Sequence, residues 1–251
     1  MTALVLPALR LGSSGAEVGN WQRFLAGALG QPITADEAFG PRTHHATKTW
    51  QLAFKLTPDG VVGPRTRALA TPQGFMSFLQ AKHFTRVPSS RSIDVLVVHD
   101  MEYPEKPEGA EWCAQFFAGV NGMIAPQASA HYSVDCDSIV QSVRDGDVAW
   151  HAKGANHNGI GIEHAGYARQ SRADWLDAYS SAELALSARL AARLCHLYAI
   201  PIARVDSAGL KAGARGITGH HDVNQAFGGG PHWDPGPNFP YDEYLRLIQA
   251  A

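Results

Sequence analysis

A run of mostly β-branched residues in the middle of the chain limits the possible folds more than any other feature. Residues 93–100 read IDVLVVHD, and such a near-continuous run is typical of a strand buried on both faces of a sheet. Residues 128–135 (ASAHYSVD) and 138–143 (SIVQSV) alternate like paired strands. Residues 159–166 (GIGIEHAG) predict a further strand, rich in glycine where another group must approach closely.

Helical patterns alternate with these strands. Ser180, followed three residues later by Glu183, can form a capping box and predicts a helix start. Behind it, leucines recur at helical spacing up to Pro201, which predicts the end of the helix; they are Leu186, Leu190, Leu194 and Leu197. Residues 216–223 (GITGHHDV) predict a short strand that leads into a glycine-rich loop. The expected fold of residues 91–251 is therefore α/β, with a mixed central sheet flanked by helices.

The N-terminal part has a different texture and an internal repeat. Residues 35–51 and 57–70 both contain an acidic residue followed by Gly-Pro-Arg-Thr and a helical pattern. Proline directly after glycine suits the first position of a helix. We expect a small three-helix domain over residues 9–70. Residues 71–90 form a linker that is too apolar for a free tether, and we expect it to pack on the second domain as a short helix.

Composition excludes several classes of protein. The chain has 251 residues, 45% of them hydrophobic, and a formal net charge of −2. This balance argues against disorder and against binding a polyanion by bulk electrostatics, so we expect no nucleic-acid or membrane partner. No apolar stretch approaches the ~20 residues of a membrane helix. Residues 1–12 lack the basic start and apolar run of a secretory signal.

Three polar side chains at predicted strand ends and in a rigid loop suggest a metal site. His99 ends the buried strand, His220-His221-Asp222 closes a second short strand, and Asp234 lies in a loop stiffened by prolines. Two imidazoles and a carboxylate are suitable ligands for a catalytic zinc ion that keeps one position open for water. Taken singly, each histidine also has a structural interpretation, because strand-end histidines commonly pack in a core or at its rim. The three cysteines (Cys113, Cys136 and Cys195) form no C-x-x-C pair; we interpret them as small buried apolar residues, with a Cys113–Cys136 bridge as the alternative.

Sequence motifs at the N-terminal end resemble a known domain. Residues 9–25 (LRLGSSGAEVGNWQRFL), 39–56 (FGPRTHHATKTWQLAFKL) and 59–69 (DGVVGPRTRAL) follow the order of turns in the peptidoglycan-binding domain of many bacterial and phage cell-wall hydrolases. The resemblance covers about sixty residues. It implies that this part of the chain binds peptidoglycan.

A second resemblance covers residues 93–244. The motifs VVHD, ASAHYSVD, DVAWHA, NGIGIEHAG, GHHDV and HWDPGPNFPY occur in the order seen in zinc-dependent N-acetylmuramoyl-L-alanine amidases of type 2. That group includes phage lysozyme-type amidases and is similar to peptidoglycan recognition proteins. The resemblance implies one Zn²⁺ bound by His99, His220 and Asp234, with His221 pointing away. It also implies that Glu163 is the catalytic carboxylate, which would orient a zinc-activated water and carry its proton.

One position departs from the family pattern. Many relatives have lysine two residues before the last ligand, where this chain has His232. An imidazole can still donate a hydrogen bond to an oxyanion, so we expect a catalytic role for His232. Matched motifs also supply candidate substrate-binding residues, namely His131, Tyr132, Trp150, His151 and Asn158.

The expected function is hydrolysis of the amide bond between N-acetylmuramic acid and L-alanine of the stem peptide. Two alternatives stay open: a zinc endopeptidase that cuts within the stem peptide, and a non-catalytic peptidoglycan-recognition protein. The expected partner is peptidoglycan, both glycan strand and stem peptide, bound by a monomer. Action on the cell wall without a visible signal peptide suits a phage endolysin or a secreted mature form.

Overall fold

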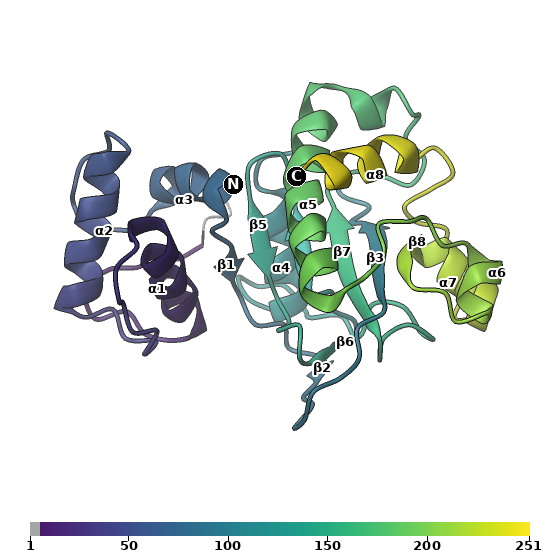
Figure 1. Cartoon of the computed structure of the whole chain (residues 1–251), viewed down its shortest axis with the longest axis horizontal. Coiled ribbons are helices and arrows are strands. Elements are labelled where there is room, and N and C mark those ends of the chain that lie inside the picture. The colour runs from purple at the N-terminus through teal and green to yellow at the C-terminus, as the bar shows by residue number, and fades with distance from the viewer. Residues whose placement is uncertain (1–5) are drawn as a thin grey trace.

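The computed structural model describes residues 6–251; the first five residues, part of the segment considered for a signal peptide, lie outside the described residues. A small helical unit at the N-terminal end lies beside a larger unit built on a sheet (Figure 1). Within the described part of the chain, no helix combines the length and hydrophobicity needed to cross a bilayer.

The N-terminal unit packs around two tryptophans. Its helices are α1 (Ala16–Leu29), α2 (Pro41–Ala53) and α3 (Pro64–Ala70). The rings of Trp21 and Trp50 are fully buried and meet edge to face, with centroids 5.7 Å apart. Both α2 and α3 begin with the proline of a Gly-Pro pair, as the sequence predicts, because proline has a helical φ and needs no N–H partner in the first turn.

Two buried glutamines explain the internal repeat. Each side-chain amide donates to the acidic residue, a backbone carbonyl and the threonine of one repeat. In the second repeat, Gln51 donates to Asp59 Oδ1 (2.9 Å), Val61 O (3.0 Å) and Thr66 Oγ1 (3.3 Å). In the first repeat, Gln22 donates to Asp36 Oδ1 (2.7 Å), Ala38 O (3.0 Å) and Thr43 Oγ1 (2.9 Å). Each glutamine carbonyl also accepts a backbone N–H from the turn. The repeated residues therefore close two equivalent turns, each around one buried amide.

The larger unit is built on a mixed sheet with the strand order β1-β5-β4-β7-β3-β8. The strands are β1 (Ser77–Phe78), β3 (Val95–Asp100), β4 (Tyr132–Val134), β5 (Ile139–Gln141), β7 (Gly159–His164) and β8 (Gly216–Gly219). Neighbours are parallel except for β4 and β5. The strand expected from IDVLVVHD is β3, which lies between β7 and β8 and is buried along its whole length.

Helices cover both faces of the sheet (Figure 1). On one face, α5 (Ala178–Tyr198) and α8 (Tyr241–Ala250) pack against alternate strand residues such as Leu96 and Val98. On the other face lie α4 (Gly109–Ala118), α6 (Ser207–Lys211) and α7 (His220–Phe227). The 3-10 turn η2 (Asp174–Leu176) precedes α5. This arrangement confirms the expected α/β fold with a mixed sheet flanked by helices.

The long helix α5 differs in detail from its prediction. Its N-cap is Asp177, whose carboxylate accepts the Ser180 N–H at 2.9 Å, so the helix begins before the expected capping box. The predicted leucine stripe is buried except for Leu197, which is 57% exposed near the last turn.

The segment between the two units is extended, which corrects the short helix expected within residues 71–90. After the 3-10 turn η1 (Thr71–Gln73), β1 adds in parallel to β5, and β2 (Phe84–Thr85) pairs with β6 (Val148–Ala149). Phe75 is buried in the core of the N-terminal unit, whereas Ala81 belongs to a core cluster of the sheet unit. An extended chain can direct nearby apolar side chains into two different cores, which a single helix face cannot do.

Candidate active site

The site begins at the carboxyl end of β3. In the parallel pairing of β3 and β7, His99 lies directly beside Glu163. Paired residues on neighbouring strands project from the same face of a sheet, so both side chains lie on the face that α4 and α7 cover. The buried strand pattern thus brings an imidazole and a carboxyl group together from positions 64 residues apart.

The second histidine comes from a helix. His220 is the first residue of α7, and β8 ends one residue earlier at Gly219, which corrects the expectation that His220 closes a strand. His221 is exposed and its ring accepts a hydrogen bond from Gln225 at 2.8 Å, so it points away from the site. The reason is the turn of the helix between successive residues and not the alternation along a strand.

Asp234 lies in the loop between α7 and α8. Its backbone carbonyl accepts the His221 N–H at 3.0 Å, which ties the loop to the start of α7. Gly236 has φ of +87°, and a Cβ there would lie 1.9 Å from the carbonyl oxygen of Ala168. The loop therefore packs directly on the segment after β7, and only glycine fits at this contact.

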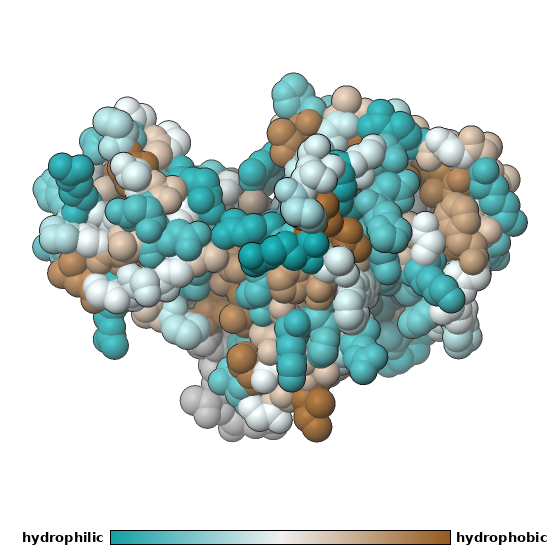
Figure 2. Space-filling view, turned by 90° about the horizontal axis from the view of Figure 1, so that it is seen from below, coloured by the Kyte–Doolittle hydropathy of each residue, from teal (hydrophilic) through white to brown (hydrophobic). Residues whose placement is uncertain are grey.

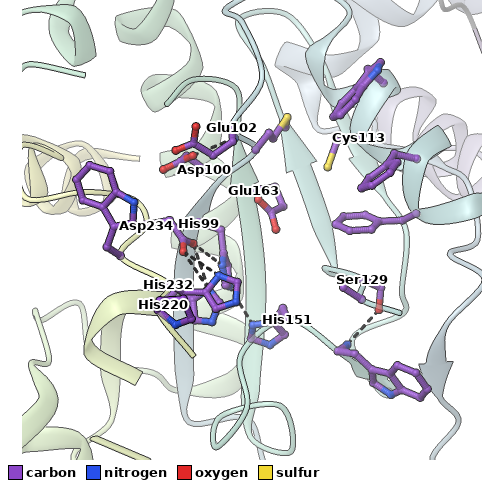
Figure 3. A pocket seen from close by; sticks show the side chains of 18 of the residues that line it. His99, Asp100, Glu102, Cys113, Ser129, His151, Glu163, His220, His232 and Asp234 are labelled. Atoms are coloured by element: carbon purple, nitrogen blue, oxygen red, sulfur yellow. Dashed lines mark hydrogen bonds and ion pairs between the residues drawn. The ribbon is translucent and has the colours of Figure 1, made fainter. Parts of the chain in front are cut away.

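The three side chains converge on one point (Figure 3). Nδ1 of His99 lies 2.9 Å from Asp234 Oδ2, and Nδ1 of His220 lies 3.1 Å from Asp234 Oδ1. One ligand atom of each residue lies within 4.8 Å of the others. Ligands of a tetrahedral zinc ion, at ~2.0–2.2 Å from the metal, are roughly 3.4 Å apart. Two nitrogen donors and one oxygen donor at this spacing fit one such ion.

The protonation states of these ligands suit a cation. Burial lowers the pKa of His99, an effect that its hydrogen bond with Asp234 only partly opposes. Burial alone would raise the pKa of Asp234, but hydrogen bonds from His220 and His99 outweigh it and hold that pKa well below its usual range. At neutral pH, His99 is therefore a neutral imidazole and Asp234 a carboxylate, the forms that bind metal ions.

Glu163 has the opposite electrostatic environment. Burial raises its pKa well above the ordinary value, and the nearby charges of Asp234 and Asp100 raise it further. In Figure 3 its carboxyl group lies in the cavity wall beside the three converging side chains. A carboxyl group whose pKa is raised in this way, in a cavity, is a candidate for transferring a proton.

His232 lies at the rim of the site. Its ring stacks on that of His220 with centroids 4.4 Å apart, and its Nδ1 lies 3.9 Å from Asp234 Oδ1. The side chain is exposed. It can therefore turn a ring N–H toward a group bound beside the three ligands.

These side chains line a cavity of about 610 Å³. One wall is aromatic and comes mostly from α4, where Trp112 stacks between Tyr103 (4.0 Å) and Phe116 (5.4 Å). Sequence reasoning missed this wall. The available signal was the pair Trp112 and Phe116, four residues apart and therefore on one side of a helix.

The expected substrate-binding residues fall into two groups. Trp150 and His151 line the cavity. His131 and Tyr132 are buried, at 0% and 2% exposure, and lie away from the cavity lining, as does Asn158, which donates to Asp94 at 3.2 Å. In this conformation those three side chains contribute to packing and hydrogen bonding, and substrate contact is not supported for them.

The cysteines are free thiols in the described structure. Cys113 and Cys195 are buried in apolar clusters, as expected, whereas Cys136 is partly exposed. Cys113 also lines the cavity near Glu163.

Two family models match the chain. Residues 14–69 match a putative peptidoglycan binding domain, and residues 89–237 match N-acetylmuramoyl-L-alanine amidase, which is more than half of the chain. The chain belongs to the N-acetylmuramoyl-L-alanine amidase family. This amidase is therefore a hydrolase, and it acts on peptidoglycan.

The chain is also similar to individual proteins and solved structures. N-acetylmuramoyl-L-alanine amidase A of Achromobacter lyticus is 34% identical over 133 residues, which are 50% of this chain and 71% of that protein. The solved structure of a selenomethionine derivative of AmpD shares the fold, with a TM-score of 0.51 and 24% identity over 69% of this chain and 94% of that chain. Staphylococcus aureus AmiA gives a TM-score of 0.49 at 18% identity, covering 68% of this chain and 81% of its own.

Proposed function

We propose that this amidase cleaves the bond between the lactyl group of N-acetylmuramic acid and L-alanine with one Zn²⁺ held by His99, His220 and Asp234. The observation that carries the proposal is the convergence of three ligand atoms within 4.8 Å in the cavity wall. Bound there, the ion would polarise the lactyl carbonyl and lower the pKa of a water molecule.

Glu163 is the catalytic residue that moves the proton. Its position beside His99 in the sheet register supports this role, and its raised pKa suits a group that both takes and gives a proton. The carboxyl group accepts a proton from the attacking water and delivers it to the nitrogen of L-alanine as the C–N bond breaks.

His232 stabilises the oxyanion that forms on the lactyl carbonyl. Its exposed ring lies over His220 at the rim of the cavity and can donate one N–H. Oxyanion donors of this kind contribute on the order of 3–4 kcal/mol to catalysis. In this role His232 replaces the lysine of many relatives.

The rest of the chain brings peptidoglycan to the site. Trp150, His151 and the aromatic wall of α4 contact the glycan strand and stem peptide, since flat rings pack well on sugar and peptide faces. The N-terminal unit anchors the polymer and raises the local concentration of bonds at the cavity. The amidase acts as a monomer on the cell wall. It reaches the wall either by endolysin-type release or as a secreted mature form.

Digestion of purified sacculi tests the proposal. We compare the wild type with His99→Ala and with His157→Ala, an exposed histidine that serves as the matched control. Wild type and control are expected to contain one zinc per chain and to release free amino groups on L-alanine, identified by mass spectrometry. His99→Ala should lose both metal and product.

Two results would contradict the proposal. New ends within the stem peptide would identify an endopeptidase. Full activity in a wild-type preparation stripped of all metal would remove the role of the ion.

A further inference from the structure

We propose that His151 is a positioning residue for the metal site, because it accepts a hydrogen bond from Nε2–H of His99 and so keeps Nδ1 of His99 free for the ion. This inference rests on the proposed role of His99 as a ligand. It gives His151 a role in addition to the substrate contact expected from the sequence.

Both ring nitrogens of His99 are engaged. Nδ1 faces Asp234 Oδ2 at 2.9 Å, and Nε2 lies 3.1 Å from Nδ1 of His151. A neutral imidazole carries one N–H and one lone pair. If the Nδ1 lone pair of His99 is to bind a cation, the proton must be on Nε2, and Nδ1 of His151 must then be the acceptor.

With the opposite arrangement of protons on the two histidine rings, His99 could not bind the ion through Nδ1. If His151 donated from Nδ1, Nε2 of His99 would be the acceptor and the His99 proton would be on Nδ1. That N–H would point at Asp234, so two of the three ligand atoms would be bonded to each other. The His99–His151 contact therefore decides whether the ligand set is ready for an ion.

The backbone and neighbouring strands hold His151 firmly in place. Its ring lies over β7, where a Cβ on Gly161 would be 2.6 Å from His151 Cγ and one on Gly159 would be 3.3 Å from Cε1. The N–H groups of His151 and Ala152 both donate to Asn156 Oδ1, at 3.0 and 2.7 Å. The two glycines thus supply the space that brings this ring to His99, which explains the glycine-rich strand noted in the sequence.

Zinc affinity of the full-length chain tests the assignment. In His151→Phe the ring shape remains but the acceptor is lost, and in His151→Asn a carbonyl oxygen can take the place of Nδ1. We expect the zinc dissociation constant, measured by competition with a chelator, to rise roughly 10–100-fold for His151→Phe. His151→Asn should recover most of that loss, and the control His157→Phe should match the wild type.

Nitrogen-15 NMR of the histidine rings gives a second readout that needs no catalysis. In metal-free protein, the fraction of His99 protonated at Nε2 is expected to fall in His151→Phe and to stay near the wild-type level in His151→Asn. An unchanged tautomer together with unchanged zinc affinity in His151→Phe would overturn the inference.

The outcomes separate this inference from the proposed function. A wild type that binds no zinc would overturn the metal site itself. A wild type that binds zinc, with folded His151→Phe binding it equally well, would overturn only the role of His151. If His151→Phe fails to fold, His151→Asn decides, because a 10-fold or greater loss of affinity in that folded variant would also contradict the assignment.

Discussion

Two carboxyl groups in the cavity wall have pKa shifts of opposite sign. Asp234 is held ionised by hydrogen bonds from two imidazoles, whereas burial and like charges raise the pKa of Glu163. Pairs of acids whose environments separate their pKa values commonly divide two roles between them. Here Asp234 is suited to binding a cation and Glu163 to carrying a proton.

Replacement of Glu163 separates these roles. Glu163→Gln keeps the shape of the side chain but cannot transfer a proton, so we expect the rate of sacculus digestion to fall by about 10²–10⁴-fold. Zinc content should stay at the wild-type value. The control is Glu243→Gln, at a partly exposed glutamate on α8. A Glu163→Gln rate within tenfold of the wild type would contradict the catalytic assignment.

Buried histidines make stability depend on pH. Burial, followed by the charge of Arg91, lowers the pKa of His131 to about 3. Below the unfolded-state pKa of about 6.5, the unfolded chain binds a proton that the folded chain does not, so the free energy of unfolding decreases as the pH falls.

The effect of His131 can be isolated by difference. Between pH 7.5 and 5.5 this single group should lower the free energy of unfolding by about 1.4 kcal/mol. Urea unfolding of the wild type and of His131→Asn at both pH values measures it. Over this pH interval, the free energy of unfolding of the variant should fall by about 1.4 kcal/mol less than that of the wild type. Equal pH dependence of the two proteins would contradict the assignment of a neutral buried ring.

At the scale of elements, each turn of the N-terminal unit depends on one glutamine. Gln51→Leu fills a similar volume but leaves Asp59, the Val61 carbonyl and the Gly60 N–H without their partner. We expect a loss of about 1–3 kcal/mol in the free energy of unfolding. Urea unfolding monitored by tryptophan fluorescence measures this loss. Gln249→Leu, exposed on α8, should change stability little, and an equal effect of the two substitutions would contradict this account.

Some elements could be predicted because their patterns have one interpretation. The β-branched run before His99 requires a buried strand, and the Gly-Pro pairs fix two helix starts. Residues 216–223 are ambiguous, since a short apolar run does not distinguish a strand from the first turn of a helix. His220 was therefore expected at the end of a strand and lies at the start of α7.

Other features could not be predicted because they depend on packing between distant segments. No spacing in the sequence states which helix covers which face of the sheet, so the aromatic wall of Trp112 and Phe116 was missed. His131 and Tyr132 occur in a matched motif next to the site, but their side chains are buried by the sheet and its helices. The linker formed strands because the edge of β5 offered unpaired backbone groups.

At the scale of the whole molecule, Arg67 connects the N-terminal unit to the sheet. This buried arginine on α3 pairs with Glu17 of α1 and donates to Ser77 Oγ of β1 at 2.7 Å. Burial raises the pKa of Glu17, and the charge and hydrogen bond of Arg67 oppose that effect. Removing one member of such a pair leaves the other charge buried and unpaired.

A double-mutant cycle tests this connection. Arg67→Leu is expected to lower the free energy of unfolding by roughly 3–5 kcal/mol, and addition of Glu17→Leu should restore much of that loss. Thermal and urea unfolding of the two single variants and the double variant give the coupling. Simple additivity of the two single effects would show that the pair is not coupled.

The edge strand β1 has a consequence for how a polymer would be degraded. The chain leaves the N-terminal core at Phe75 and enters the catalytic sheet at Ser77. No flexible linker therefore separates the two units at this point of the described chain. A catalytic domain joined to its binding domain by a flexible linker could reach any bond within a sphere around the point of attachment. We therefore expect the cuts of this amidase to fall at a set distance from the point of attachment, and the released fragments to have a narrow distribution of lengths.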